Sequence, residues 1–160
     1  MNINRILILG STYLTELVVQ RLLNTRYELV GHVPSRRTTV SGNIPLPEVD
    51  IDSDCDIILS VQYDMLVKNP KKCYNFHTGL LPEYGGLDIL RHTLEEKAHE
   101  QGATFHKMNE KYDSGPIISK ITYPVFENDT IKSLYKRQCS IVPDFVVSCL
   151  SLLENMKEKI

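Results

Sequence analysis

The sequence lacks a dominant charge, and it lacks a long apolar run. Its 18 Lys and Arg residues nearly balance 20 Asp and Glu residues, which gives a formal net charge of -2. This balance offers no electrostatic basis for binding nucleic acid or a membrane surface. The apolar run at residues 6–9 is too short for a signal peptide, and no stretch reads as long enough to span a bilayer. We therefore expect neither a nucleic-acid partner nor a membrane-bound chain.

The sequence also lacks the paired Cys and His spacings of metal sites. Its four cysteines are far apart, and its five histidines form no ligand cluster. We therefore predict no metal. Cys55 and Cys73 fall in or beside apolar runs and read as small core residues. Unpaired cysteines of this kind fit a reducing, cytoplasmic location.

The length and the absence of repeats or linkers indicate one domain spanning residues 1–160, with no additional C-terminal domain. An aliphatic strand at 5–9, a helix at 12–24 and a strand at 27–33 form a βαβ opening. Further strands are expected at 56–61 and 73–77. This alternation predicts an α/β fold, a single Rossmann-like three-layer domain with a mostly parallel sheet.

The second half of the chain should supply the remaining elements. A helix is expected at 87–101, with Leu87, Leu90 and Leu94 facing inward and Gly102 stopping it. Strands should follow at 104–108 and 116–125. Two helices should end the chain, one from about 129 to 140 and one whose first turn holds Pro143. Residues 34–54 read as a connection.

The first turn does not carry a dinucleotide-binding fingerprint. That fingerprint needs three glycines, whereas this turn has only Gly10. Arg36 and Arg37, just after the second strand, could suit a 2′-phosphate, but a solvated basic loop is the simpler interpretation. A weaker hypothesis is that the two arginines hold a phosphate of the substrate.

Three polar residues in the central segment form a set suited to acyl transfer. Asn75 and His77 lie two apart in a short apolar run, so on a strand they share one face. Asp113 opens a turn before a later apolar run. An amide and an imidazole can hold a developing oxyanion, and a carboxylate can orient the imidazole. The alternative is that Asn75 caps a turn and His77 is a satisfied loop histidine.

This segment resembles the folate-dependent formyltransferase family in several ordered pieces. The matching positions are Asn75, His77, Leu80, Leu81, Pro82, Tyr84, Gly86, Gly102, Thr104, His106, Asp113, Gly115, Ile117 and Ile118. The resemblance implies that Asn75, His77 and Asp113 are the catalytic trio. It also implies a pterin pocket at Tyr63, Asp64, Met65 and Leu66. Met65 and Leu66 could also begin a small core helix, which is compatible with such a pocket. For His106, a structural role is at least as fitting as a catalytic one.

By the same resemblance, the expected activity is N-formyl transfer from the co-substrate 10-formyltetrahydrofolate to a primary amine. The favoured acceptor is a nucleotide-linked amino sugar, a small molecule. Hydrolysis of 10-formyltetrahydrofolate and transfer to glycinamide ribonucleotide remain alternatives. A folate-binding module without activity is the non-enzymatic alternative. The oligomeric state, including a homodimer, is left open.

Overall fold

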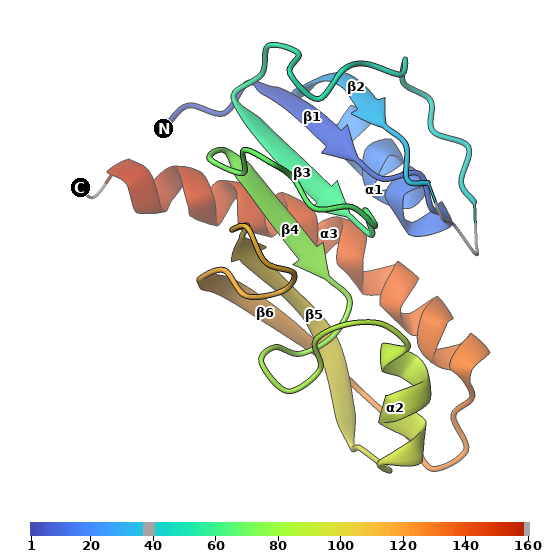
Figure 1. Cartoon of the computed structure of the whole chain (residues 1–160). Coiled ribbons are helices and arrows are strands. Elements are labelled where there is room, and N and C mark those ends of the chain that lie inside the picture. The colour runs from blue at the N-terminus through green and yellow to red at the C-terminus, as the bar shows by residue number, and fades with distance from the viewer. Residues whose placement is uncertain (37–40, 159–160) are drawn as a thin grey trace.

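A computed structural model gives the fold, and it describes residues 1–36 and 41–158. One six-stranded sheet has the strand order β2-β1-β3-β4-β5-β6 (Figure 1). The elements in chain order are β1 (Arg5–Leu9), α1 (Tyr13–Leu23), β2 (Glu28–Val33), β3 (Ile57–Val61), β4 (Cys73–His77), α2 (Ile89–Glu95), β5 (Glu100–Lys107), β6 (Ile117–Pro124) and α3 (Ile131–Glu158).

The first four strands of the sheet are parallel. β1 pairs with β2 and β3, and β3 pairs with β4, all in parallel, whereas β5 and β6 are antiparallel additions. The βαβ opening predicted from the sequence is present and confirms the Rossmann-like, mostly parallel sheet. The carboxyl ends of β3 and β4 lie side by side, which is where open α/β sheets bind their ligands.

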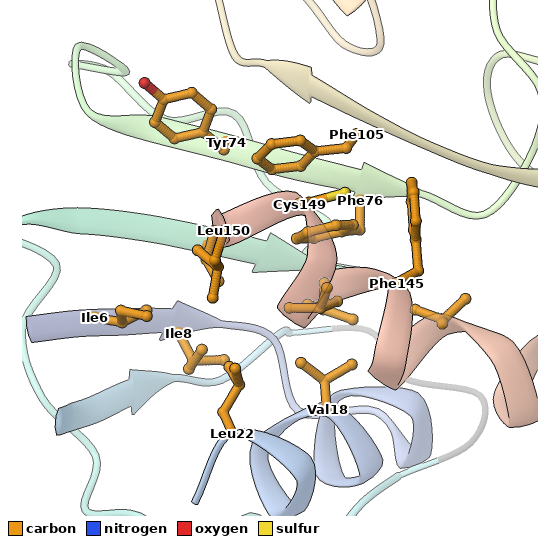
Figure 2. Packing of buried hydrophobic residues seen from close by; sticks show 14 of the residues in the cluster. Ile6, Ile8, Val18, Leu22, Tyr74, Phe76, Phe105, Phe145, Cys149 and Leu150 are labelled. Carbon is orange, nitrogen blue, oxygen red and sulfur yellow. The ribbon is translucent and has the colours of Figure 1, made fainter. Parts of the chain in front are cut away.

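Helices α1 and α3 cover one face of the sheet (Figure 1). α1 begins after Thr12, whose hydroxyl accepts a hydrogen bond from the Thr15 backbone N–H at 3.2 Å. Between these helices and the sheet lies the main apolar core, in which aromatic rings stack (Figure 2). Phe105 is central, with ring centroids 4.6 Å from Phe76 and 5.6 Å from Tyr74. The core fixes β4 firmly against β5.

The opposite face of the sheet is covered by connecting segments. Its smaller apolar cluster joins strand residues such as Leu7 and Ile58 to Val49, Val67 and Met108 from the connections. Among the described residues, 41–54 contain no helix and only isolated bridges, such as the one between His32 and Glu48. The third layer is therefore built from loops, which leaves this face open for a site.

The predicted helix at 87–101 is wrong in length and orientation. α2 covers only Ile89–Glu95, and Leu87 is 85% exposed rather than buried. Asp88 and Lys97, just outside its two ends, both have positive φ, a backbone state that a helix cannot continue through. Residues from Glu100 onward instead pair with β6. Gly102 is part of β5, and a Cβ there would lie 1.9 Å from the Ile121 carbonyl oxygen.

The two predicted C-terminal helices are one helix. α3 runs unbroken through Pro143. An internal proline costs about 3 kcal/mol, but side chains on both sides of it, including Leu134, Phe145 and Leu150, are buried in the core. By length and composition, Ile131–Met156 could cross a membrane, so the expectation that no segment is long and apolar enough was wrong. Part of this helix, including Leu134, Val146 and Leu150, is buried against the sheet.

Candidate active site

Strand β4 presents two polar side chains on the loop-covered face of the sheet. Tyr74 and Phe76 point into the helix-covered core (Figure 2). Strand alternation therefore turns Asn75 and His77 to the other face. Ser60 of β3 pairs with Asn75 and lies beside it. The interpretation of Asn75 and His77 as neighbours on one face is correct, and His77 is only 7% exposed.

Asp113 reaches His77 from the loop between β5 and β6. Its Oδ1 lies 3.2 Å from His77 Nδ1, and its Oδ2 accepts a hydrogen bond from the Gly86 N–H at 3.0 Å. Gly115 lets this loop close tightly, since a Cβ there would lie 1.5 Å from the Lys107 carbonyl oxygen. The loop is thus pressed against β5, and Asp113 joins β4 to the segment around Gly86.

Both ring nitrogens of His77 face oxygen acceptors. Nδ1 faces the Asp113 carboxylate, and Nε2 lies 2.5 Å from the Tyr84 carbonyl oxygen. Because a carbonyl can only accept, His77 Nε2 is the donor in its contact with Tyr84. Burial by itself raises the pKa of Asp113. The hydrogen bonds from His77 and the Gly86 N–H outweigh burial and bring that pKa below its usual value.

An Asp113→Asn variant should lose stability in a pH-dependent way. Asn keeps the shape and tolerates the positive φ of 52° at this position, but it removes the charge beside His77. Because the folded-state pKa of Asp113 is depressed, its stabilisation is fully present above the unfolded value of 3.8 and is lost as pH falls through the folded value. Urea denaturation should therefore show a deficit at pH 6 that narrows below pH 3.8.

The matched control for this prediction is Asp52→Asn, at an exposed carboxylate. It should change the free energy of unfolding little at either pH. A deficit in Asp113→Asn that stays the same from pH 6 to pH 3 would show that the contact with His77 does not contribute as a charge.

A fourth polar side chain joins the three predicted ones. His106 of β5 is directly opposite Asn75 of β4, and its Nε2 lies 3.0 Å from Asn75 Nδ2. Its Nδ1 lies 3.1 Å from the Lys107 carbonyl oxygen. Burial lowers the pKa of His106 more than the Lys107 carbonyl and Asp113 raise it. His106 is therefore held neutral beside the amide of Asn75.

The predicted pterin-binding segment borders the same site. A pocket of about 40 Å³ is lined by Ser60, Tyr63, Met65, Leu66, Asn75, His106, Met108, Lys111, Tyr112 and Asp113. Asp64, the fourth residue of the predicted segment, is not among the lining residues. Its side chain accepts a hydrogen bond from the Arg36 backbone N–H at 3.1 Å, and its backbone carbonyl accepts one from the Tyr112 hydroxyl at 3.4 Å. The alternative that Met65 and Leu66 begin a helix is wrong, since the described chain is not helical there.

The pocket is smaller than the roughly 300–1,000 Å³ of most small-molecule sites. The Tyr112–Asp64 hydrogen bond links the two loops that border it. A larger groove of about 520 Å³ lies between β6 and α3, but none of the predicted catalytic residues lines it. We place the candidate site at the smaller pocket because the titratable and polar groups converge there.

The other sequence-based hypotheses concern phosphate and metal. The backbone N–H of Arg36 bonds to Asp64, next to the pocket, and the Arg36 side chain is exposed. Arg37 lies outside the described residues. Within residues 1–36 and 41–158, no cluster of three or more His, Cys, Asp or Glu side chains is arranged to hold a metal ion. Because Arg37 is not described, the hypothesis that Arg36 and Arg37 hold a substrate phosphate remains a prediction.

Sequence reasoning missed part of the pocket wall. Met108, at the end of the strand predicted at 104–108, lines the pocket but was not named as a site residue. Ser60 could have been found from its pairing with Asn75, which requires the strand order. Nothing in the sequence pointed to Tyr112, because it lies in an irregular loop that is held in place by its own turn.

Comparison with known proteins identifies a family. A model of the family described as "Formyl transferase" matches residues 53–148. A methionyl-tRNA formyltransferase from Kosmotoga olearia is 34% identical over 101 residues, covering 59% of this chain and 32% of the relative. The chain spans less than half the length of the curated relatives it matches.

Two solved structures share the fold at low sequence identity. An N-formyltransferase from Helicobacter canadensis superimposes with a TM-score of 0.80 at 19% identity, over 95% of this chain and 65% of that one. A phosphoribosylglycinamide formyltransferase from Bacillus halodurans gives a TM-score of 0.72 at 20% identity, over 92% and 96%. Because the family match covers more than half of the sequence, including β3, β4 and the Asp113 loop, the chain belongs to the formyl transferase family.

Proposed function

We propose that this chain catalyses formyl transfer from 10-formyltetrahydrofolate to a primary amine. The observation that carries the proposal is the convergence of Asn75 and Asp113 on one pocket, with His77 3.2 Å from Asp113. An amide and a carboxylate that line one cavity, with an imidazole in contact with the carboxylate, form a set suited to acyl transfer. Membership of the formyl transferase family supports the same activity.

In the proposed reaction, the amine nitrogen attacks the formyl carbon and negative charge develops on the formyl oxygen. The new carbon–nitrogen bond forms as the bond from the formyl carbon to the folate nitrogen breaks. A proton passes from the attacking amine to the leaving nitrogen. Asn75 lines the pocket and supplies N–H to the oxygen. The Asp113 carboxylate lies 3.2 Å from His77 Nδ1 and orients the imidazole.

His77 can donate to the formyl oxygen only after its present hydrogen-bond contact is broken. Its Nε2 faces the Tyr84 carbonyl oxygen, so it reaches a formyl oxygen only if the segment around Tyr84 shifts. That segment contains Gly85 and Gly86, and a Cβ at Gly86 would meet no atom within 4 Å. We propose that substrate binding moves this segment and transfers the His77 donor from the carbonyl to the substrate.

The folate co-substrate fits the chemistry of the pocket wall. Tyr63, Met65, Leu66 and Met108 supply apolar surface, and Ser60, Lys111 and Tyr112 supply polar groups. A pterin ring needs this combination of an apolar wall with a few polar contacts. The Helicobacter canadensis relative was solved in complex with folinic acid. We propose that the folate portion lies against Tyr63, Met65 and Leu66.

For the acceptor, we propose a nucleotide-linked amino sugar. The support is that the Helicobacter canadensis relative was solved in complex with dTDP-3-aminofucose and has a TM-score of 0.80 to this chain. Glycinamide ribonucleotide is the second candidate, because the Bacillus halodurans phosphoribosylglycinamide formyltransferase also shares the fold. Hydrolysis without an amine is the third, since the same trio could activate water.

One assay separates these functions. Purified chain is mixed with 10-formyltetrahydrofolate and either a dTDP- or GDP-linked amino sugar, glycinamide ribonucleotide or no amine, and tetrahydrofolate release is followed by absorbance. We expect release that depends on an amino sugar. Equal release without any amine would indicate a hydrolase. Folate binding without release in any mixture would indicate a binding module and would contradict the enzymatic proposal.

A further inference from the structure

The Asn75–His106 pair crosses between β4 and β5 at the wall of the candidate pocket. The two residues are directly opposite in the antiparallel register, and both line the pocket. The pairing of β5 with β6 shifts its register between Phe105 and His106, as at a β-bulge or a similar irregularity. Bulges re-aim the side chains next to them. His106 is only 2% exposed, so its contacts inside the protein fix its ring.

The contacts of His106 specify one tautomer. Its Nδ1 faces the Lys107 carbonyl oxygen at 3.1 Å, and a carbonyl only accepts hydrogen bonds, so Nδ1 carries the proton. In the neutral ring, Nε2 is then an acceptor. The Asn75 Nδ2 at 3.0 Å must therefore be the donor. His106 thus accepts from the amide nitrogen and turns the amide oxygen of Asn75 away from itself.

We infer that His106 is a positioning residue: by accepting one N–H of the Asn75 amide, it leaves the second N–H of the same nitrogen to face the reacting formyl oxygen. This inference rests on the proposed function and deepens it. The Asn75 amide has two orientations of nearly equal shape, which differ by exchange of oxygen and nitrogen. Only the orientation that brings N–H to the formyl oxygen stabilises the charge that develops there. The other orientation would place an amide oxygen against that charge.

The surroundings of His106 favour the neutral ring that this role requires. The pocket wall also holds Asp113, Lys111, Tyr63 and Tyr112, and His77 lies behind Asp113. Burial and His77 lower the pKa of His106, and these effects outweigh Asp113 and the Lys107 carbonyl. A doubly protonated ring would present N–H to the N–H of Asn75 and would force the amide to turn around.

Two variants distinguish the contribution of the His106 Nε2 acceptor from the contribution of the ring's volume. His106→Leu fills similar space without an acceptor, whereas His106→Gln places an oxygen near the position of Nε2. We expect His106→Leu to lower kcat by at least about ten-fold and up to the ~100-fold typical of losing one oxyanion donor. His106→Gln should retain most of the activity. His99→Gln, at an exposed histidine, is the control and should match the wild type.

A double-mutant cycle tests whether His106 acts through Asn75. In an Asn75→Ala background, His106→Leu should cause little further loss of kcat, because the amide that it orients is absent. Equal losses in both backgrounds would overturn the inference and would indicate a role in folding or binding alone. Retained activity in His106→Leu, with an active wild type, would overturn it as well.

A spectroscopic measurement tests the tautomer without relying on activity. In the full chain labelled with ¹⁵N-histidine, the His106 ring is assigned by its loss in His106→Gln. We expect a neutral ring at pH 7 with its proton on Nδ1. A proton on Nε2, or on both nitrogens, would overturn the inference. If the wild type releases no tetrahydrofolate with any acceptor, the proposed function fails, and the spectrum still decides the tautomer.

Discussion

An Asn75→Ala variant should lose formyl transfer by about 100- to 1,000-fold in kcat, the usual cost of removing one oxyanion donor. Asn75 lines the candidate pocket from β4, and its amide is held by His106. Its donor is worth most in the transition state, when negative charge has developed on the formyl oxygen. Binding of folate in the ground state depends mainly on the apolar wall. We therefore expect the Kd for folinic acid to change little.

The measurement is tetrahydrofolate release with the preferred amine at saturating substrate. Asn155→Ala is the matched control, because Asn155 is exposed on α3 and far along the chain from the pocket wall. It should retain wild-type kcat. An Asn75→Ala enzyme that turns over within a few-fold of the wild type would remove Asn75 from the proposed mechanism. A much higher Kd for folinic acid would instead show that Asn75 contributes to folate binding.

A Phe105→Ala variant should have the largest effect on stability, about 3–5 kcal/mol. Phe105 is fully buried and stacks on Phe76 at 4.6 Å and Tyr74 at 5.6 Å (Figure 2). The truncation leaves a cavity between β4, β5 and α3 and removes both ring contacts. Because a domain of this size loses roughly 2–4 °C of Tm per kcal/mol, the Tm should fall by roughly 6–20 °C.

The control for this prediction is Phe126→Ala, the same chemical change at a ring that is 55% exposed. Phe126 contacts the guanidinium of Arg137 at 5.2 Å, an interaction worth about 0.5–1 kcal/mol at an exposed site. Urea denaturation should therefore separate the two variants clearly. Equal losses of stability would show that the stacked cluster around Phe105 is not the centre of the core.

The sequence reveals some elements and hides others for definite reasons. The parallel strands are visible because continuous aliphatic runs such as residues 6–9 have no other stable location than a buried sheet. α2 was misjudged because the burial of Leu87 depends on where the chain turns, and the positive φ of Asp88 turns it outward. Pro143 suggested a helix boundary, yet the burial of Phe145 and Leu150 carries α3 through it.

The chain by itself determined the chemistry of the candidate site. Residue types and the two-residue spacing predicted that Asn75 and His77 share one strand face, and the resemblance to the formyltransferase family implied that they act together with Asp113. Their proximity was decided only by the tertiary structure. The loop after β5 folds back because Gly115 fits against the Lys107 carbonyl, and this brings Asp113 to 3.2 Å from His77.

The contacts of His106 were also decided by the tertiary structure. The sequence left it open between a structural and a catalytic residue, since a histidine two positions into a strand pattern fits either. Antiparallel pairing of β4 with β5 places it opposite Asn75, and the Lys107 carbonyl selects its tautomer. Local sequence determines which groups a strand carries, but hydrogen-bond partners from other strands determine which atom donates and which accepts.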